Sequence, residues 1–255
     1  GLKDIDQAIE TWSGYLARHK KDFKVLTRIA DGYRKKGDSE KSLEYYSKAL
    51  AIKPDDAFAL MGMGEIYTRK GDDESALSYF EKVLRKNEKM IVALTSMANI
   101  YRNRGDYEKA NDYYEKAIKY DPRNTFAWHG KADCLRGLKR PGEAIEAWRT
   151  AMKYGMSKRV VLTRIGDAFL NLQDYDQAEN SYREALTAGY DKYAYFGLAR
   201  ICMIRNHKDE IRLIFKRLME EEPNDKRIEA EFRTFVEKYP ELAERMTPGA
   251  GKPGS

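Results

Sequence analysis

Tyr45-Tyr46-Ser47-Lys48-Ala49 is a pentapeptide that the chain repeats with small changes. It returns as Tyr79-Phe80-Glu81-Lys82-Val83, as Tyr113-Tyr114-Glu115-Lys116-Ala117 and as Ser181-Tyr182-Arg183-Glu184-Ala185. The aromatic residue at its second position recurs every 34 residues, as Trp12, Tyr46, Phe80, Tyr114, Trp148 and Tyr182. A constant step of this length predicts an architecture that is built from one repeated structural unit.

Each period predicts two helices joined by a tight turn. In the period that starts near residue 23, Leu26, Ile29 and Tyr33 follow steps of three and four, which place them on one face of a helix. The turn Lys36-Gly37-Asp38 follows, because Gly can take the left-handed conformation that ends a helix and Asp can cap the next one. Proline cannot continue a hydrogen-bonded helix, and it closes several of the periods. These prolines are Pro54, Pro122 and Pro223.

A 34-residue helix–turn–helix unit with this order of large, small and aromatic residues resembles the tetratricopeptide repeat. The resemblance covers roughly residues 2–225. It implies an all-α fold in which antiparallel helix pairs stack into a right-handed superhelical solenoid, with the first helix of each pair on the concave side. In such a stack, small residues such as Ala49, Ala76 and Ala110 let neighbouring aromatic rings approach.

The repeat pattern also predicts the domain organisation. Six repeats are expected, at 23–56, 57–90, 91–124, 125–158, 159–191 and 192–225. Residues 1–22 supply only a second helix, so we expect a truncated repeat there and a longer array in the parent protein. Residues 226–246 are expected to form capping helices, and the segment 247–255, rich in Gly and Pro, a flexible tail.

The composition argues against several other classes of protein. Lys plus Arg is 47 and Asp plus Glu is 41, which leaves a net charge of +6, and these charges are interspersed along the chain. We therefore expect no nucleic-acid binding. No apolar stretch approaches the roughly 18 to 20 residues that a membrane-spanning helix needs. We expect a soluble protein whose compartment stays open, with the cytoplasm favoured.

The sequence contains no motif for catalysis or for a cofactor. No phosphate-binding loop of the form G-x-x-x-x-G-K-[ST] occurs. Two cysteines and three histidines are too few and too dispersed for a metal site, and Cys134 and Cys202 are expected to be buried free thiols. We therefore expect no enzyme activity, no cofactor and no metal ion.

The candidate binding site is the part of each first helix that packing does not use. Equivalent positions of successive repeats form an apolar row, an acidic row and a basic row along the predicted groove. The candidate groove residues are Arg28, Asp31, Phe58, Met61, Glu65, Thr95, Asn99, Phe126, His129, Asp133, Arg164, Asp167, Tyr193, Phe196 and Arg200.

Two interpretations of the charged rows stay open. In the first, they are a solvated helix surface with pairs three residues apart, such as Asp31 with Arg34. In the second, they line a peptide groove in which basic groups of a ligand meet Glu65, Asp133 and Asp167. The clamp with which some tetratricopeptide domains hold a C-terminal carboxylate is not expected, because the matching positions hold neither a basic residue nor asparagine.

The preferred function is a protein–protein interaction scaffold or adaptor that holds a partner peptide or helix in this groove. Two alternatives remain. The array could be the targeting or regulatory region of a larger enzyme or assembly whose catalytic part lies outside this chain. It could also be a scaffold that forms homo-oligomers through its terminal helices, such as the unpaired helix predicted at residues 3–20.

Overall fold

The structure, a computed structural model, describes residues 2–19 and 21–240. In this part of the chain, 14 α-helices follow one another with no strand between them. None of these described helices is long and apolar enough to span a lipid bilayer. Residues 241–246 of the predicted capping region and the predicted tail at 247–255 lie outside the described residues.

The helices fall into two compact units, Gly1–Leu138 and Lys139–Ser255. The first unit contains α1 (Leu2–Arg18), α2 (Phe23–Lys36), α3 (Ser39–Ile52), α4 (Ala57–Lys70), α5 (Asp73–Lys86), α6 (Ile91–Asn103), α7 (Tyr107–Tyr120) and α8 (Thr125–Gly137). The second unit contains α9 (Pro141–Lys153), α10 (Lys158–Asn171), α11 (Tyr175–Thr187), α12 (Lys192–Arg205), α13 (Lys208–Glu221) and α14 (Lys226–Lys238). The boundary between the units falls inside the predicted repeat 125–158, so α8 and α9 belong to different units.

Aspartate side chains fix where many of the helices begin. The Oδ1 atom of Asp56, for example, accepts a hydrogen bond of 3.0 Å from the backbone N–H of Ala59 in the first turn of α4. The same cap is formed by Asp22, Asp38, Asp72, Asp106, Asp174, Asp191 and Asp225. At the other end of α2, Gly37 takes the left-handed conformation with a φ of 84°. The turn predicted at Lys36-Gly37-Asp38 is therefore confirmed.

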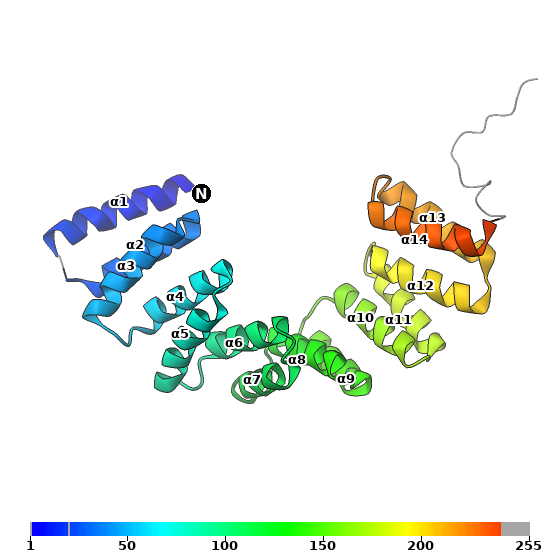
Figure 1. Ribbon diagram of the computed structural model, residues 1–255, viewed down its shortest axis with the longest axis horizontal. Helices are drawn as coiled ribbons and strands as arrows, with labels where there is room; N and C mark the ends of the chain where they lie inside the picture. Colours follow the sequence, from blue (N-terminus) through cyan, green and yellow to red (C-terminus); the bar gives the residue numbers. More distant parts are fainter. Residues whose placement is uncertain (1, 20, 241–255) are drawn as a thin grey trace, which may run out of the picture. The chain divides into compact units, whose positions relative to one another are not determined.

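Within each unit, every helix packs against the next helix along the chain (Figure 1). In the first unit, one core cluster joins α2, α3 and α4 through Leu26, Tyr46, Ala49 and Met63. Ala49, Ala76 and Ala110 are fully buried, as close packing of aromatic rings requires. Since each element contacts mainly its neighbours in sequence, the prediction of an all-α helical solenoid is confirmed. The right-handed superhelix and the repeat boundaries stay predictions.

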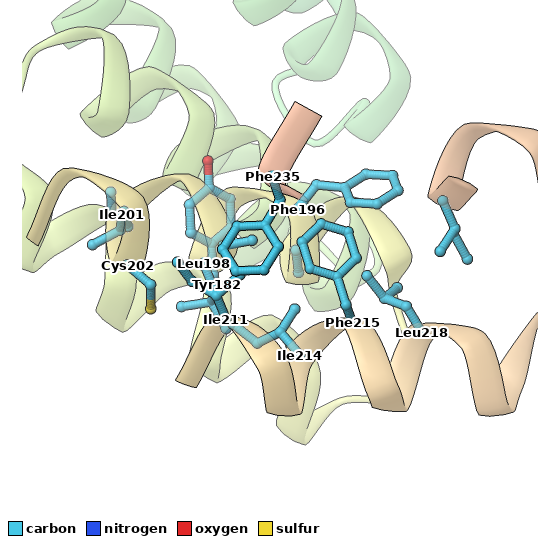
Figure 2. Close-up of a cluster of buried hydrophobic side chains, with 14 of the residues drawn as sticks. Tyr182, Phe196, Leu198, Ile201, Cys202, Ile211, Ile214, Phe215, Leu218 and Phe235 are labelled. Atoms are coloured by element: carbon cyan, nitrogen blue, oxygen red, sulfur yellow. The ribbon is translucent and has the colours of Figure 1, made fainter. Parts of the chain in front are cut away.

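A core cluster of the second unit joins residues of α10 to α14 (Figure 2). Phe235 of α14 is fully buried, and its ring centroid lies 5.6 Å from that of Phe215 in α13 and 5.3 Å from that of Tyr239. Ring separations of this size are favourable for aromatic pairs. The α14 helix therefore covers apolar surface of the two helices before it.

The position of Phe196 corrects the sequence analysis, which places this residue in the binding groove. The side chain is only 3% exposed and belongs to the same core cluster of the second unit as Phe235 (Figure 2). The guanidinium of Arg227, in the first turn of α14, also lies 5.9 Å from its ring centroid. Phe196 is therefore not accessible to a ligand in the groove, because α14 covers its side chain.

Both cysteines are buried free thiols, as predicted. Burial raises the pKa of Cys134 and of Cys202 to about 12, because the thiolate would lose its hydration. Among the described residues, no group of three or more His, Cys, Asp and Glu side chains could hold a metal ion.

The start of α14 is expected to make the second unit sensitive to acid. Asp225 accepts a hydrogen bond of 2.6 Å from Lys192 Nζ and caps the N–H of Ile228, and these contacts lower its pKa from 3.8 to about 2. Since the folded pKa lies below the unfolded value, this contribution to stability is complete above pH 3.8 and is lost as the pH falls toward 2.

The Asp225→Asn variant tests this contribution, because asparagine keeps the cap and removes the ionised partner of Lys192. We expect the variant to unfold at a lower urea concentration than the wild type at about pH 5, and the difference to disappear near pH 2. The measurement is the urea midpoint at both pH values. A difference that stays constant across this range would show that the carboxylate of Asp225 does not carry the effect.

Candidate functional site

A cavity of about 610 Å³ lies in the first unit between α1, α2, α3 and α4. We call it the first cavity. Its lining residues are Trp12, Phe23, Lys24, Thr27, Arg28, Asp31, Arg34, Tyr46, Lys53, Asp56, Phe58, Met61, Gly62 and Glu65. The structure thus brings together five of the predicted groove residues, namely Arg28, Asp31, Phe58, Met61 and Glu65.

The aromatic ring of Tyr46 fits against a glycine of the next first helix. A Cβ atom added to Gly62 would lie 2.2 Å from Cζ of this ring, so no other residue fits at position 62 without displacing the ring. Burial raises the pKa of Tyr46 to about 12, and the nearby charge of Asp31 adds to this shift. The phenol is therefore neutral at physiological pH.

The acidic groups of the first cavity are held by the protein's own cations. Arg34 donates from Nε to Asp31 Oδ1 at 3.1 Å and from Nη1 to Glu65 Oε2 at 2.6 Å, which links α2 to α4. Burial alone would raise the pKa of Asp31, but hydrogen bonds from Lys35 and Arg34 outweigh it and lower the pKa.

The same pairing recurs between the next two first helices of this unit. Arg102 of α6 donates to Asp133 of α8 at 3.1 Å, and His129 Nδ1 lies 3.6 Å from the same carboxylate. Asp133 is almost fully buried, so it is not part of a solvated surface. Glu65 and Asp133 therefore serve contacts between helices of the first unit.

Large apolar side chains project from the first helices into solvent. Phe58 of α4 is 80% exposed, Val92 of α6 is 55% exposed and Phe126 of α8 is 75% exposed. They occupy equivalent positions, 34 residues apart. Single exposed apolar residues are common in soluble proteins, but a row at one repeat position is a typical sign of an interaction surface.

Two further predicted groove residues of the first unit bond to protein atoms. The hydroxyl of Thr95 donates to the backbone oxygen of Ile91 at 3.0 Å. The side-chain oxygen of Asn99 accepts a hydrogen bond of 2.6 Å from the hydroxyl of Tyr114. Thr95 thus bonds within α6, and Asn99 links α6 to the neighbouring α7.

A second cavity, of about 620 Å³, lies in the second unit beside α10 and α12. Its lining residues are Arg159, Val160, Thr163, Arg164, Asp167, Tyr190, Asp191, Lys192, Tyr193 and Glu222. It brings together the predicted residues Arg164, Asp167 and Tyr193. Asp167 accepts a hydrogen bond of 2.7 Å from the Tyr182 hydroxyl. Arg200 is not part of this lining, and it forms an ion pair of 3.2 Å with Glu231 of α14.

The first and second cavities occupy equivalent positions in the repeat. The matching pairs are Thr27 with Thr163, Arg28 with Arg164, Asp31 with Asp167, Asp56 with Asp191 and Phe58 with Tyr193. The first three pairs are 136 residues apart and the last two are 135 apart. Each cavity therefore combines an arginine of one first helix with an aromatic ring of the next.

A period of two repeats appears in the packing of the buried tyrosines. Tyrosines 68 residues apart each pack against a glycine of the following first helix, and a Cβ atom on that glycine would lie 2.1 to 2.2 Å from Cζ of the ring. The three pairs are Tyr46 with Gly62, Tyr114 with Gly130 and Tyr182 with Gly197.

Sequence reasoning missed the parts of the first cavity that do not come from first helices. Trp12 of α1 and Tyr46 of α3 belong to second helices, whereas the groove residues predicted from the sequence all lie on first helices. For Tyr46 the signal is the step of 68, since it singles out this tyrosine and its partner Gly62, whereas Trp12 does not take part in that step.

The fold and the repeat geometry place the chain among helical-repeat proteins, and comparison with family models identifies the kind of repeat. Residues 23–89, 92–124, 113–146 and 163–225 each match a family model described as tetratricopeptide repeat. The chain belongs to the tetratricopeptide repeat family. Such repeats are typically non-catalytic modules of protein-interaction scaffolds. No curated protein matches the chain.

Several solved structures share the fold at low sequence identity. The C-terminal part of a repeat protein from Cytophaga hutchinsonii is 16% identical with a TM-score of 0.75, over 89% of this chain and 94% of that one. PilF of Pseudomonas aeruginosa is 16% identical with a TM-score of 0.67, over 92% and 99%. YrrB, described as having an unusual peptide-binding site, is 19% identical with a TM-score of 0.63, over 73% and 96%.

Proposed function

We propose that the chain is a protein-interaction scaffold that holds a peptide segment of a partner protein against its first helices. The observation that carries this proposal is the row of exposed apolar side chains at one repeat position, Phe58, Val92 and Phe126. The first of them lines a cavity with apolar walls. Clefts that combine apolar walls with a few polar groups are the usual form of binding sites.

Membership in the tetratricopeptide repeat family supports the same reading, because this family commonly binds proteins and peptides. The fold of YrrB, a protein described by its peptide-binding site, is consistent with it. Ion pairs also fix the first helices that carry the apolar side chains. Arg34 links α2 to α4, and Arg102 links α6 to α8.

A selection of phage-displayed random 12-residue peptides against the immobilised chain tests the proposal. We expect enriched peptides that bind the wild type and bind the Phe58→Ser/Phe126→Ser double variant at least about tenfold more weakly, since an anchoring apolar side chain contributes about 1.5 to 3 kcal/mol. The melting temperature should hardly change, because both side chains are mostly exposed.

Leu213→Ser is the matched control, because Leu213 is 66% exposed but lies on α13, a second helix. Its peptide affinity should equal that of the wild type. Failure of any peptide to enrich, or equal binding of all three proteins, would contradict a binding role for the first helices.

A further inference from the structure

The charges that line the first cavity are not all used by the fold. The lining contains four cations, Lys24, Arg28, Arg34 and Lys53, and three acids, Asp31, Asp56 and Glu65. The formal balance is therefore 4 − 3 = +1. Which of these charges are available to a ligand depends on the contacts that each of them already makes.

Every acid of the lining is engaged within the protein. Asp31 and Glu65 are ion-paired with Arg34. Asp56 is buried, caps the N–H of Ala59 at 3.0 Å and has Lys53 Nζ at 3.6 Å from its other oxygen. A basic group of a ligand would have to displace one of these contacts, which gives it little advantage over water.

Two of the four cations have no such engagement. Arg34 is held by two carboxylates, and Lys53 lies beside Asp56 and 4.8 Å from the ring centroid of Phe23. Lys24 and Arg28, by contrast, are exposed and make no ion pair or side-chain hydrogen bond with the described residues of the chain. The charge that the first cavity offers to a ligand is therefore positive.

The apolar part of the same lining adds a second requirement. Phe58 is 80% exposed, and Trp12, Phe23 and Met61 complete the apolar wall around it. A large apolar group of a ligand would gain free energy by covering this surface. An arginine can at the same time bind a carboxylate through two parallel hydrogen bonds.

We infer that the first cavity selects an acidic peptide segment, in which a carboxylate pairs with Arg28 and a neighbouring large apolar side chain packs on Phe58. The inference rests on the proposed function and specifies the charge and the apolar side chain of the peptide ligand. It also reverses the expectation that basic ligand groups meet Glu65, because Arg34 already neutralises that carboxylate.

One observation favours this ligand over a nucleic acid, and a second shows that the two recognition groups recur in the chain. A single excess positive charge is small for a nucleic acid, whose binding depends on several neutralised phosphates. The combination of arginine and aromatic ring also recurs in the second cavity as Arg164 and Tyr193, so the pairing in the first cavity is not an isolated coincidence.

The peptide selection described above also tests the inference. Among the peptides whose binding is lost in Phe58→Ser, we expect Asp and Glu to be enriched over Lys and Arg next to a Phe, Leu, Trp or Met. The Arg28→Glu variant should bind these peptides about tenfold or more weakly, since it replaces an attraction with a repulsion. Raising the salt concentration should weaken binding to the wild type more than to the Arg28→Gln variant.

Arg85→Glu is the matched control. Arg85 is exposed on α5, does not line the first cavity and changes the net charge by the same amount, so its peptide affinity should stay within about twofold of the wild type. Thermal unfolding of Arg28→Glu checks that the fold is intact, and we expect it unchanged because Arg28 is exposed.

The outcomes separate the two proposals. Enrichment of basic or uncharged peptides that still depend on Phe58 would overturn the acidic ligand and leave the scaffold function standing. Equal loss of affinity in Arg28→Glu and Arg85→Glu would also overturn it, because a general charge effect would then explain the selection. Peptides that depend on Phe126 but not on Phe58 would overturn only the acidic ligand of the first cavity. Absence of any peptide that binds the Phe58→Ser/Phe126→Ser variant more weakly than the wild type would overturn both.

Discussion

Replacing Phe235 with alanine is expected to lower the free energy of unfolding of the second unit by about 3 to 5 kcal/mol, the usual range for a buried phenylalanine. The side chain is fully buried, and its ring contacts Phe215, Phe232 and Tyr239. Its loss would remove aromatic contacts and leave a cavity between α13 and α14. The same change should expose Phe196, which α14 covers in the wild type.

Urea unfolding combined with hydrogen exchange measures this effect. In Phe235→Ala we expect α12, α13 and α14 to lose protection while α2 to α6 of the first unit keep theirs, because each helix contacts mainly its neighbours. The matched control is Phe126→Ala, since Phe126 is 75% exposed and should change stability by no more than about 0.5 kcal/mol. A loss below about 1 kcal/mol in Phe235→Ala would contradict its role as the main cover of this core.

Gly62→Ala is expected to destabilise the first unit by about 2 kcal/mol, although alanine is the better helix former. The new Cβ would lie 2.2 Å from Cζ of Tyr46, whose ring is buried among Leu26, Ala59 and Met63. Overpacking at such a contact costs about 3 kcal/mol, and the gain in helix propensity of about 1 kcal/mol offsets only part of it.

Gly14→Ala provides the control for the propensity term, because Gly14 lies within α1 and a Cβ atom there would have no neighbour within 4 Å. The free energy of unfolding of this variant should exceed that of the wild type by about 0.5 to 1 kcal/mol. The urea midpoints of both variants give the comparison. In a Tyr46→Leu background, Gly62→Ala should lower the free energy of unfolding by less than it does in the wild type. If the free-energy changes of the two substitutions simply add in the double variant, the steric explanation is excluded.

The sequence predicts the helices well because their determinants are local. Leu26, Ile29 and Tyr33 mark the buried face of α2, and Gly37 with Asp38 ends that helix and starts the next. The same Gly-Asp turn returns as Gly71-Asp72 and Gly105-Asp106, so the assignments in these three repeats support one another. A division of the array at Leu138 has no comparable local signal, since the repeat pattern runs through it.

The candidate site was less predictable because it depends on contacts between helices. Phe196 shares its repeat position with Met61, and only the packing of α14 makes it a core residue. Glu65 and Asp133 looked like an open acidic row, yet each meets an arginine that stands 31 residues earlier in the chain. A periodic pattern identifies equivalent positions, but it does not say which neighbour each of them contacts.

The 68-residue period limits how this array can change in length. Removing one repeat, such as 57–90, would place the Tyr46 ring opposite Ser96, whose Cβ would occupy the space that Gly62 leaves open. Removing two repeats, 57–124, would place Tyr46 opposite Gly130, which already accommodates an identical ring from Tyr114. Gene duplication or protein engineering that lengthens or shortens this solenoid should therefore succeed most readily in steps of four helices.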